Sequence, residues 1–325
     1  MRTFTRSLIP VVAAMAIAMP ATAQSPAAPV VNPGDTIGIS LISTTDTNTV
    51  NAMNAFKALA TADGWTINEV DTQGDQNNAN TAIESFVNQG VKGIVSTIYP
   101  ADALQAGITA ANTAGIPVVG HFSGDGPGLA AFSSSGGDDQ MTRAMVDAMG
   151  GTGEILALTY RPGKPCLERE VILDAVLGEN PGITVTKQEM TIPDYIEPTA
   201  DAARGWAQSR PAGGAPLAIW GCWEGFTLAA ITSLKELDRK DIKTYGYNGD
   251  ADAQQAIRDG WLTATTWFDN VAVGEDEYRI LLDAIAAGAD WVPPVEVPAT
   301  TVVVNVETID AWLTEHPEAV PPAAQ

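Results

Sequence analysis

Few side chains in this 325-residue sequence combine the type and spacing that catalysis or metal binding requires. His121 and His316 have no nucleophile motif beside them and no further ligand at a metal-binding spacing. No Gly-x-Ser-x-Gly elbow is present, and no Gly-x-Gly-x-x-Gly follows a predicted strand, so neither acyl transfer nor dinucleotide chemistry is indicated. Paired carboxylates such as Asp138 and Asp139 are typical of helix starts. The sequence therefore predicts a protein that is not an enzyme and that needs neither a cofactor nor a metal.

Cys166 and Cys222 are the two cysteines of the chain. In an oxidising compartment such a pair is bridged more often than in the cytosol. A disulfide bond between them would close a long loop and stabilise the fold by roughly 4 kcal/mol on the chain-entropy model, less any strain. A bridged pair and two free thiols are both compatible with the sequence.

The elements that must position any functional group alternate regularly along the chain. Apolar strand-like runs are followed by amphipathic helix-like stretches, which is typical of a parallel sheet covered by helices on both faces. The first half has predicted strands at 36–42, 66–70, 93–98 and 116–120 and helices at 49–63, 77–88 and 101–114. The second half has predicted strands at 154–159, 183–190, 217–220, 243–247 and 262–266 and helices at 139–149, 167–178, 199–209, 226–237 and 252–259. The expected class is α/β, with two doubly wound parallel-sheet lobes.

Three features predict how the chain divides between these lobes. The glycine-rich stretch 124–137 is typical of a crossing from one lobe to the other. A helix-like run at 270–287 and the prolines Pro293, Pro294 and Pro298 can return the chain to the first lobe. We therefore expect an N-terminal lobe of residues 36–134 and 269–299, a C-terminal lobe of 135–268 and 300–316, a multi-strand hinge, and a frayed tail at 317–325.

The N-terminus and the net charge bear on the compartment and the partners. Arg2 and Arg6 precede an apolar run at 8–19, and Ala21-Thr22-Ala23 provides a small-x-small cleavage site. These features predict a signal peptide at 1–23 and a flexible leader at 24–35; the alternative is an uncleaved anchor, although the run is short for a membrane span. The formal charge of -22 repels phosphate backbones and anionic membranes, so we expect no nucleic-acid partner and no stable membrane insertion.

Several local sequences, in order, resemble those of a known family. They are Ile37-Gly38-Ile39-Ser40, Gly115-Ile116-Pro117-Val118-Val119, Leu228-Ala229-Ala230-Ile231 with Leu234-Lys235-Glu236, Tyr245-Gly246-Tyr247-Asn248-Gly249 and Ala256-Ile257-Arg258-Asp259-Gly260. From about residue 36 to 306 the chain resembles the ribose-binding protein family, the type I periplasmic binding proteins of sugar importers. The resemblance implies a periplasmic monomer that closes two lobes around a small ligand and delivers it to the membrane subunits of an ABC importer.

The resemblance also implies ligand-binding residues at the strand ends of the first lobe. Thr45, Asp46 and Asn48 follow the first strand and would contact ligand hydroxyls, although Asp46 or Asn48 could instead cap the next helix. His121 and Phe122 stand where the family usually carries an Asp-Arg pair. This departure removes two charge-assisted hydrogen bonds and adds a flat apolar surface, and a purely structural role for His121 is the alternative.

In the second lobe the resemblance points to one arginine and to several departures. Arg169 matches the family's ligand-binding arginine, unless it only forms surface ion pairs with Glu168 or Glu170. The other matched positions are Tyr195 for a family aromatic, Trp223 and Glu224 for an Asn-Asp pair, Asn248 for an aspartate, and Trp267 and Phe268 for a glutamine. Core packing is the alternative role of each aromatic residue.

These departures predict a cleft that is more aromatic and less charged than a ribose site. A monosaccharide or polyol is the expected ligand. The alternatives are a flatter aromatic molecule, a cation held by ring faces near Glu224, or a receptor subunit that reports occupancy to a membrane sensor. A transcriptional repressor with this fold is excluded by the export signal and the negative charge.

Overall fold

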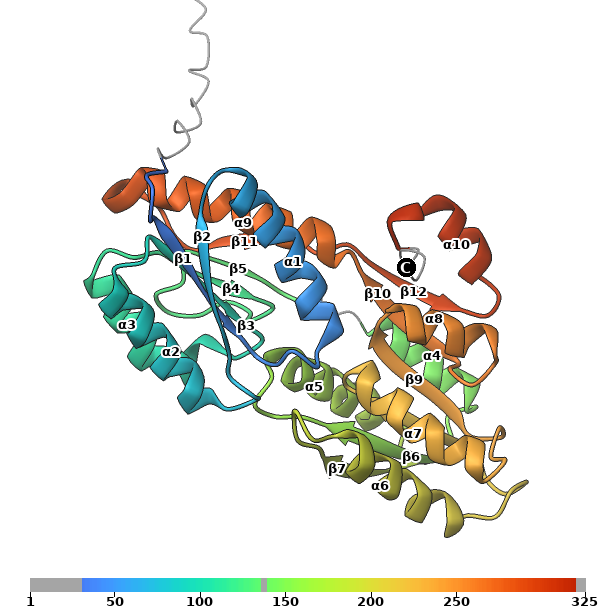
Figure 1. Ribbon diagram of the computed structural model, residues 1–325. Coiled ribbons are helices and arrows are strands. Elements are labelled where there is room, and N and C mark those ends of the chain that lie inside the picture. The colour runs from blue at the N-terminus through green and yellow to red at the C-terminus, as the bar shows by residue number, and fades with distance from the viewer. Residues whose placement is uncertain (1–30, 136–138, 320–325) are drawn as a thin grey trace, which may run out of the picture.

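The computed structural model describes residues 31–135 and 139–319, which form two lobes with one six-stranded sheet each (Figure 1). The α/β class with two doubly wound parallel-sheet lobes, predicted from the sequence, is confirmed. The predicted signal peptide at 1–23 and the leader up to residue 30 lie outside the described residues. Within the described ranges, no helix is both long and apolar enough to cross a membrane.

The N-terminal lobe contains a sheet in which all neighbouring strands are parallel. Its strand order is β11-β5-β4-β3-β1-β2, with β1 Thr36–Leu41, β2 Thr66–Asp71, β3 Gly93–Thr97, β4 Val118–His121, β5 Ala131–Ser133 and β11 Val295–Val297. Its helices are α1 Thr47–Ala62, α2 Gln76–Gln89, α3 Gln105–Thr113 with the short η1 Ala101–Leu104 before it, and α9 Asn270–Ala287 with η2 Gly288–Asp290 after it. Helices α1 and α9 pack against each other on one face of the sheet, and α2 and α3 on the other (Figure 1).

Strand β1 shows why these helices cover both faces. Ile37 and Ile39 are fully buried in one core, with Phe56 of α1 and Tyr278 of α9. The alternate residue Gly38 faces α2, where an added Cβ would come within 2.5 Å of the Phe86 ring. Because side chains alternate along a strand, a small residue on one face lets α2 approach while branched residues fill the other face.

The C-terminal lobe repeats the plan with one antiparallel edge. Its strand order is β12-β10-β9-β8-β6-β7, with β6 Gly153–Thr159, β7 Ile183–Glu189, β8 Leu217–Gly221, β9 Lys243–Asn248, β10 Ala264–Phe268 and β12 Thr301–Asn305. Strand β12 runs antiparallel to β10 and the other neighbours are parallel. The helices are α4 Gln140–Ala148, α5 Lys164–Gly178, α6 Ile196–Gln208, α7 Glu224–Glu236, α8 Ala251–Arg258, α10 Ile309–Glu315 and η3 Pro317–Ala319.

The chain passes between the two sheets three times, after Ser133, after Phe268 and after Val297. Two strands at these passages differ from the sequence analysis. Strand β5 lies inside the glycine-rich stretch that was expected to be only a crossing, and β11 lies within the proline-rich return. The first residues of the expected tail form η3, where the Ala319 carbonyl oxygen accepts a hydrogen bond from the Gln254 side chain.

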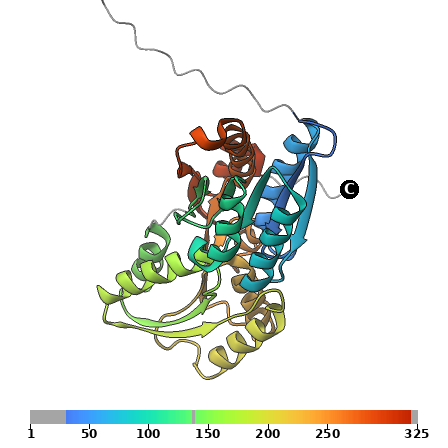
Figure 2. The ribbon, with the colours of Figure 1, turned by 90° about the vertical axis from the view of Figure 1, so that its left-hand side faces the viewer.

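The lobes touch through direct hydrogen bonds, so the molecule is closed. The backbone N–H of Lys164 donates to the Ile98 carbonyl oxygen at 2.8 Å, and the Tyr160 hydroxyl donates to the Gly74 carbonyl oxygen at 3.1 Å. In the perpendicular view of Figure 2 the blue and teal elements of the first lobe lie directly above the yellow-green elements of the second. Closure of this kind is the ordinary hinge motion of two-lobed α/β proteins.

Gly74 provides a test of closure. It has φ +74°, and an added Cβ would collide with the Ile192 carbonyl oxygen of the other lobe and lie 3.2 Å from the Tyr160 hydroxyl oxygen. We expect Gly74→Ala to oppose closure, measured as a larger radius of gyration by X-ray scattering. The control is Gly115→Ala, because Gly115 has nearly the same φ of +72° but no atom within 4 Å of the added Cβ. Equal scattering curves for the two variants would contradict the prediction.

Candidate functional site

Strand ends from both lobes line one small cavity between the sheets. The cavity measures about 40 Å³, enough for no more than a few water-sized molecules. The lining residues are Ile42, Asp46, Asn48, Ile98 and Phe122 from the first lobe, and Tyr160, Gly163, Pro165, Cys166, Arg169, Ile192, Trp223 and Asn248 from the second. In open parallel sheets this edge is the usual place for a ligand, and a larger molecule requires the lobes to part first.

The backbone is strained at this cavity. Five non-glycine residues in the described part of the chain have positive φ, and three of them, Ile98 (70°), Phe122 (47°) and Asn248 (133°), line the cavity. A positive φ is especially unfavourable for a β-branched residue such as Ile98. Its carbonyl oxygen is the one that accepts from Lys164 across the cleft. Strain of this kind concentrates at functional sites.

Arg169 is the central cation of the cavity. It is 5% exposed, and its Nη1 donates to the Cys222 carbonyl oxygen at 2.7 Å. The guanidinium lies over the Tyr247 ring at 4.4 Å and the Phe268 ring at 5.1 Å from each centroid. Burial lowers the pKa of Arg169 to about 10, which still leaves the side chain charged at neutral pH. Within residues 31–135 and 139–319, its Nε has no hydrogen-bond partner.

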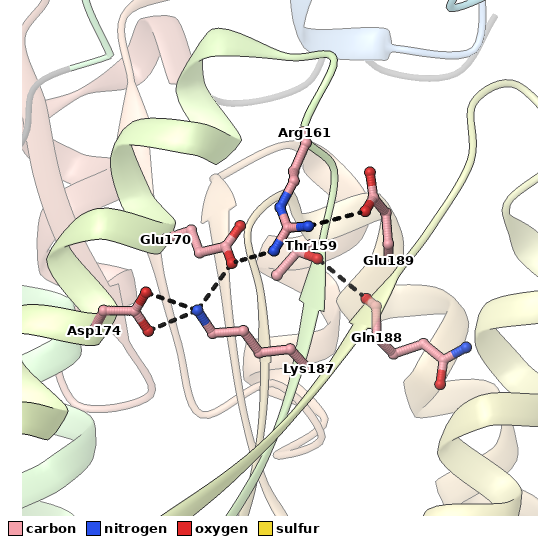
Figure 3. Close-up of polar contacts among 7 residues, drawn as sticks. All are labelled: Thr159, Arg161, Glu170, Asp174, Lys187, Gln188 and Glu189. Carbon is pink, nitrogen blue, oxygen red and sulfur yellow. Dashed lines mark hydrogen bonds and ion pairs between the residues drawn. The ribbon is translucent and has the colours of Figure 1, made fainter.

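The surface ion pairs considered for Arg169 are made by other residues (Figure 3). Glu170 accepts from Lys187 at 2.9 Å and from Arg161 at 3.3 Å, and Lys187 also pairs with Asp174 at 2.6 Å. Glu168 pairs with Lys164 instead, at 3.4 Å. These pairs attach the outer face of α5 to β7, which leaves Arg169 on the inner face of the helix.

Asp46 supplies a carboxylate from the opposite lobe. It is 7% exposed, and its Oδ2 accepts from the Thr49 hydroxyl at 2.6 Å, whereas Oδ1 has no hydrogen-bond partner among the described residues. Asp46 precedes α1 but makes no side-chain hydrogen bond that caps the helix backbone. Burial raises the pKa of Asp46, and the hydrogen bond from Thr49 partly offsets the rise.

Asp250 is a cleft carboxylate that the sequence analysis missed. Burial raises the pKa of Asp250 to about 7, and the negative charge of Asp46 in the other lobe adds to the rise. The Asn48 side chain beside it has the opposite effect. Asp250 follows the end of β9 by two residues, so a search for polar side chains just beyond the strand ends, as after the first strand, could have found it.

Glu224, predicted to bind ligand, is not among the residues that line the cavity. Its Oε2 accepts from the backbone N–H of Gly249 and from the Thr265 hydroxyl, both at 2.8 Å, and its Oε1 accepts from the backbone N–H of Asp250 at 2.7 Å. Burial and the neighbouring Asp250 raise the pKa of Glu224 well above its usual value. Glu224 therefore holds the loop after β9 in place.

His121 is also turned away from the cavity, and its structural alternative fits better. Its side chain is fully buried, and Nδ1 lies 3.0 Å from both carboxylate oxygens of Glu277 in α9. The Ser133 hydroxyl donates to the same carboxylate at 2.8 Å and accepts from the Phe122 backbone N–H at 2.7 Å. Phe122 is the first residue after β4, where the backbone turns with a φ of 47°, and its ring lines the cavity while also contacting the His121 ring at a centroid distance of 4.4 Å.

The remaining predicted residues divide between the cavity wall and the packing behind it. Trp223 lines the cavity, and its Nε1 donates to the Asn248 side-chain oxygen at 3.0 Å in the amide orientation that satisfies both groups. Tyr195 packs behind Trp223 with a centroid distance of 4.8 Å, and Phe268 lies under Arg169. Trp267 and Phe268 line a separate cavity of about 490 Å³ between α1 and α8, and Thr45 is exposed and bonded to Ser43.

The apolar wall was largely missed. Ile42, Ile98 and Tyr160 each stand one residue past the end of a strand, and Ile192 stands three residues past β7. Cys166 lines the cavity as well and is joined to Cys222 by a disulfide bond. The cavity thus has two charges, two amides and a predominantly apolar wall.

Comparisons with known proteins agree with this two-lobed arrangement. A family model described as a periplasmic binding protein domain matches residues 37–290. The xylitol-binding protein of Mycolicibacterium smegmatis is 26% identical over 230 residues, which cover 69% of this chain and 62% of the relative. The match therefore spans less than two thirds of that protein's length.

Two solved structures have the same fold. The solute binding protein of an ABC transporter from Agrobacterium vitis, with bound allitol, has a TM-score of 0.79 at 21% identity, covering 87% of this chain and 99% of that one. A solute binding protein of an ABC transporter from Bacillus halodurans C-125, with bound myo-inositol, has a TM-score of 0.73 at 19% identity, covering 90% and 100%.

The carboxyls at the cleft predict a pH dependence. A carboxyl whose pKa is raised in the folded, closed protein keeps its proton at a pH at which the same carboxyl in the unfolded chain is already ionised. The free energy of unfolding therefore falls as pH rises between these two pKa values. For Asp250 the window is about pH 4 to 7. We expect Asp250→Asn to melt at an increasingly higher temperature than the wild type as pH rises through this window. Asp252→Asn, which removes an exposed charge from the same helix, serves as the control, and parallel curves for the two variants would contradict the prediction.

Proposed function

Since the chain belongs to the periplasmic binding protein domain family, we propose that it is an exported solute-binding protein that encloses a small polyol or monosaccharide between its lobes for an ABC importer. This membership confirms the family predicted from the sequence, which is one of binding proteins and not of enzymes. The predicted signal peptide supports export, and the xylitol, allitol and myo-inositol of the similar proteins support the ligand class.

One observation carries the ligand class. Asp46 Oδ1 and Arg169 Nε are buried polar atoms from opposite lobes, on side chains that line the same cavity, and neither has a hydrogen-bond partner in the part of the chain that the structure describes. Buried polar atoms are nearly always paired, so a ligand with hydroxyl groups is the natural partner. A hydroxyl can donate to the Asp46 carboxylate and accept from the Arg169 guanidinium at the same time, which no purely apolar ligand can do.

The aromatic wall fits the other side of such a ligand. Phe122 and Trp223 present apolar surface to the cavity from opposite lobes. The C–H faces of a polyol or sugar pack against surfaces of this kind while its hydroxyls bind the polar groups. Compared with a ribose site, this cavity thus offers ligand hydroxyls one carboxylate, Asp46, and one guanidinium, Arg169. The aromatic rings of Phe122 and Trp223 stand where the family usually has polar or charged side chains.

A cationic ligand is less well supported by the same geometry. Arg169 already places its positive charge over the Tyr247 and Phe268 rings, and Glu224 is bound to the loop after β9. A second cation in the cavity would face the buried guanidinium at short range in a medium that screens charge poorly. A neutral polyhydroxylated molecule avoids this repulsion.

A ligand panel tests the proposal. Xylitol, allitol, myo-inositol, L-arabinose and glycerol are titrated against the mature protein, and binding to the closed form is expected to raise the melting temperature with the logarithm of ligand concentration. Loss of one hydrogen bond to a charged group costs roughly 1.5–3 kcal/mol, so Arg169→Met and Asp46→Asn should each weaken binding about 10- to 100-fold. Arg258→Ala, which changes an exposed arginine far from the cavity, should bind as the wild type does. A flat response to the whole panel would refute the ligand class.

Trp223 offers a separate optical test. It is 9% exposed and lines the cavity, so ligand entry changes the polarity around its indole. We expect a ligand-dependent change of tryptophan fluorescence that is lost in Trp223→Phe. Trp65→Phe is the control, because Trp65 is buried in the core between β1, α1 and α9. A signal that survives in Trp223→Phe would remove this residue from the binding wall.

A further inference from the structure

The disulfide bond of this protein lies in the wall of the cavity. Cys166 lines the cavity from the first turn of α5, and Cys222 directly follows β8 and precedes the cavity residue Trp223. The two Cα atoms are 5.0 Å apart, and both side chains are buried. The bond therefore joins the start of α5 to the end of β8 at the site itself.

Arg169 bridges the same two segments by a hydrogen bond. It follows Cys166 by three residues in α5, so the two side chains project from the same side of the helix. Its Nη1 donates to the backbone carbonyl oxygen of Cys222, the partner of Cys166, at 2.7 Å. The covalent bond thus fixes the separation of α5 and β8 that this hydrogen bond has to span.

The other contacts of Arg169 restrain its direction weakly. Its hydrogen bond to the Cys222 carbonyl oxygen is directional, whereas its contacts with Tyr247 and Phe268 are made over the ring faces. A ring face attracts a cation over a broad area and does not select one in-plane orientation of the guanidinium. The orientation of Nε toward the cavity therefore depends on the position of the Cys222 carbonyl oxygen.

The outer face of α5 is held by different means. Lys187 and Arg161 bind Glu170, which is 7% exposed, and Lys187 also binds Asp174 (Figure 3). The partners with exposed side chains, Arg161 and Asp174, add little, because exposed ion pairs yield to solvent and salt. On the inner face, from which Arg169 projects, the disulfide bond is the covalent link between α5 and the end of β8.

We propose that the Cys166–Cys222 disulfide is a positioning element of the binding site, which holds the Cys222 carbonyl oxygen where it orients Arg169 toward the ligand. This inference rests on the proposed function. A cross-link that only stabilises the fold would affect affinity equally with or without Arg169. A disulfide that positions Arg169 should affect affinity only when Arg169 is present.

A double-mutant cycle tests this dependence. Xylitol affinity is measured by calorimetry for the wild type, Cys166→Ala/Cys222→Ala, Arg169→Met and the triple variant. We expect removal of the disulfide to weaken binding about 10-fold when Arg169 is present and less than about 2-fold when Arg169 is replaced by Met. Leu173→Ala, which removes a fully buried side chain of α5 one turn beyond Arg169 and outside the cavity lining, controls for general destabilisation and should change affinity less than about 2-fold. An equal loss in both backgrounds, or an equal loss in Leu173→Ala, would overturn the inference.

A second measurement does not need a ligand. The guanidinium protons of a buried, hydrogen-bonded arginine exchange slowly, and the Arg169 signal is assigned in ¹H–¹⁵N spectra by its loss in Arg169→Met. We expect this signal to broaden or vanish in Cys166→Ala/Cys222→Ala and to persist in Leu173→Ala; persistence in both would overturn the inference. Failure of the wild type to bind any polyol would refute the proposed function alone, and the exchange measurement would still decide the role of the disulfide.

Discussion

The carboxyl ends of two parallel sheets face each other in this protein, and every candidate binding group depends on that juxtaposition. A parallel sheet gathers the ends of all its strands at one edge, so residues distant in sequence become neighbours there. Asp46 follows the first strand of one lobe and Trp223 follows the third strand of the other, yet they share a cavity wall. Each lobe alone offers half of the contacts.

The charged groups buried in this cleft each have protein contacts that offset part of the cost of burying them. Arg169 is buried against two rings and a carbonyl oxygen, which replace part of the hydration that a cation loses. Asp46 and Asp250 approach each other from opposite lobes, and the loop that carries Asp250 is fixed by the buried carboxyl of Glu224. Closing the lobes therefore brings like charges together and favours the protonated forms of these acids.

The architecture could be predicted from the sequence because strand and helix periodicity is local. The class, the two lobes and the candidate positions Asp46, Asn48, Phe122, Trp223 and Asn248 followed from the ends of predicted strands or from the family resemblance. The structure places all five of these on the cavity wall, together with Arg169. Whether they bind a ligand is the subject of the proposal above.

Neither periodicity nor resemblance specifies the direction in which a single side chain points. His121 and Glu224 are immediate neighbours of cavity residues and point away from the cavity, toward Glu277 and toward the loop after β9. Strand β10 ends two residues later than expected, which places Trp267 and Phe268 in the sheet. The positive φ of Ile98 depends on contacts between lobes that no local pattern records.

The three passages of the chain between the sheets limit what the lobes can do once they separate. A single connection would let two bodies swivel and slide freely, whereas three connections leave mainly a bend about a common axis. The binding residues of the two lobes should then return to the same relative position after every opening. Ile98, Phe122 and Asn248 are held in strained backbone conformations. These residues can contact a ligand correctly only if the opposing lobe returns to the same position each time the molecule closes.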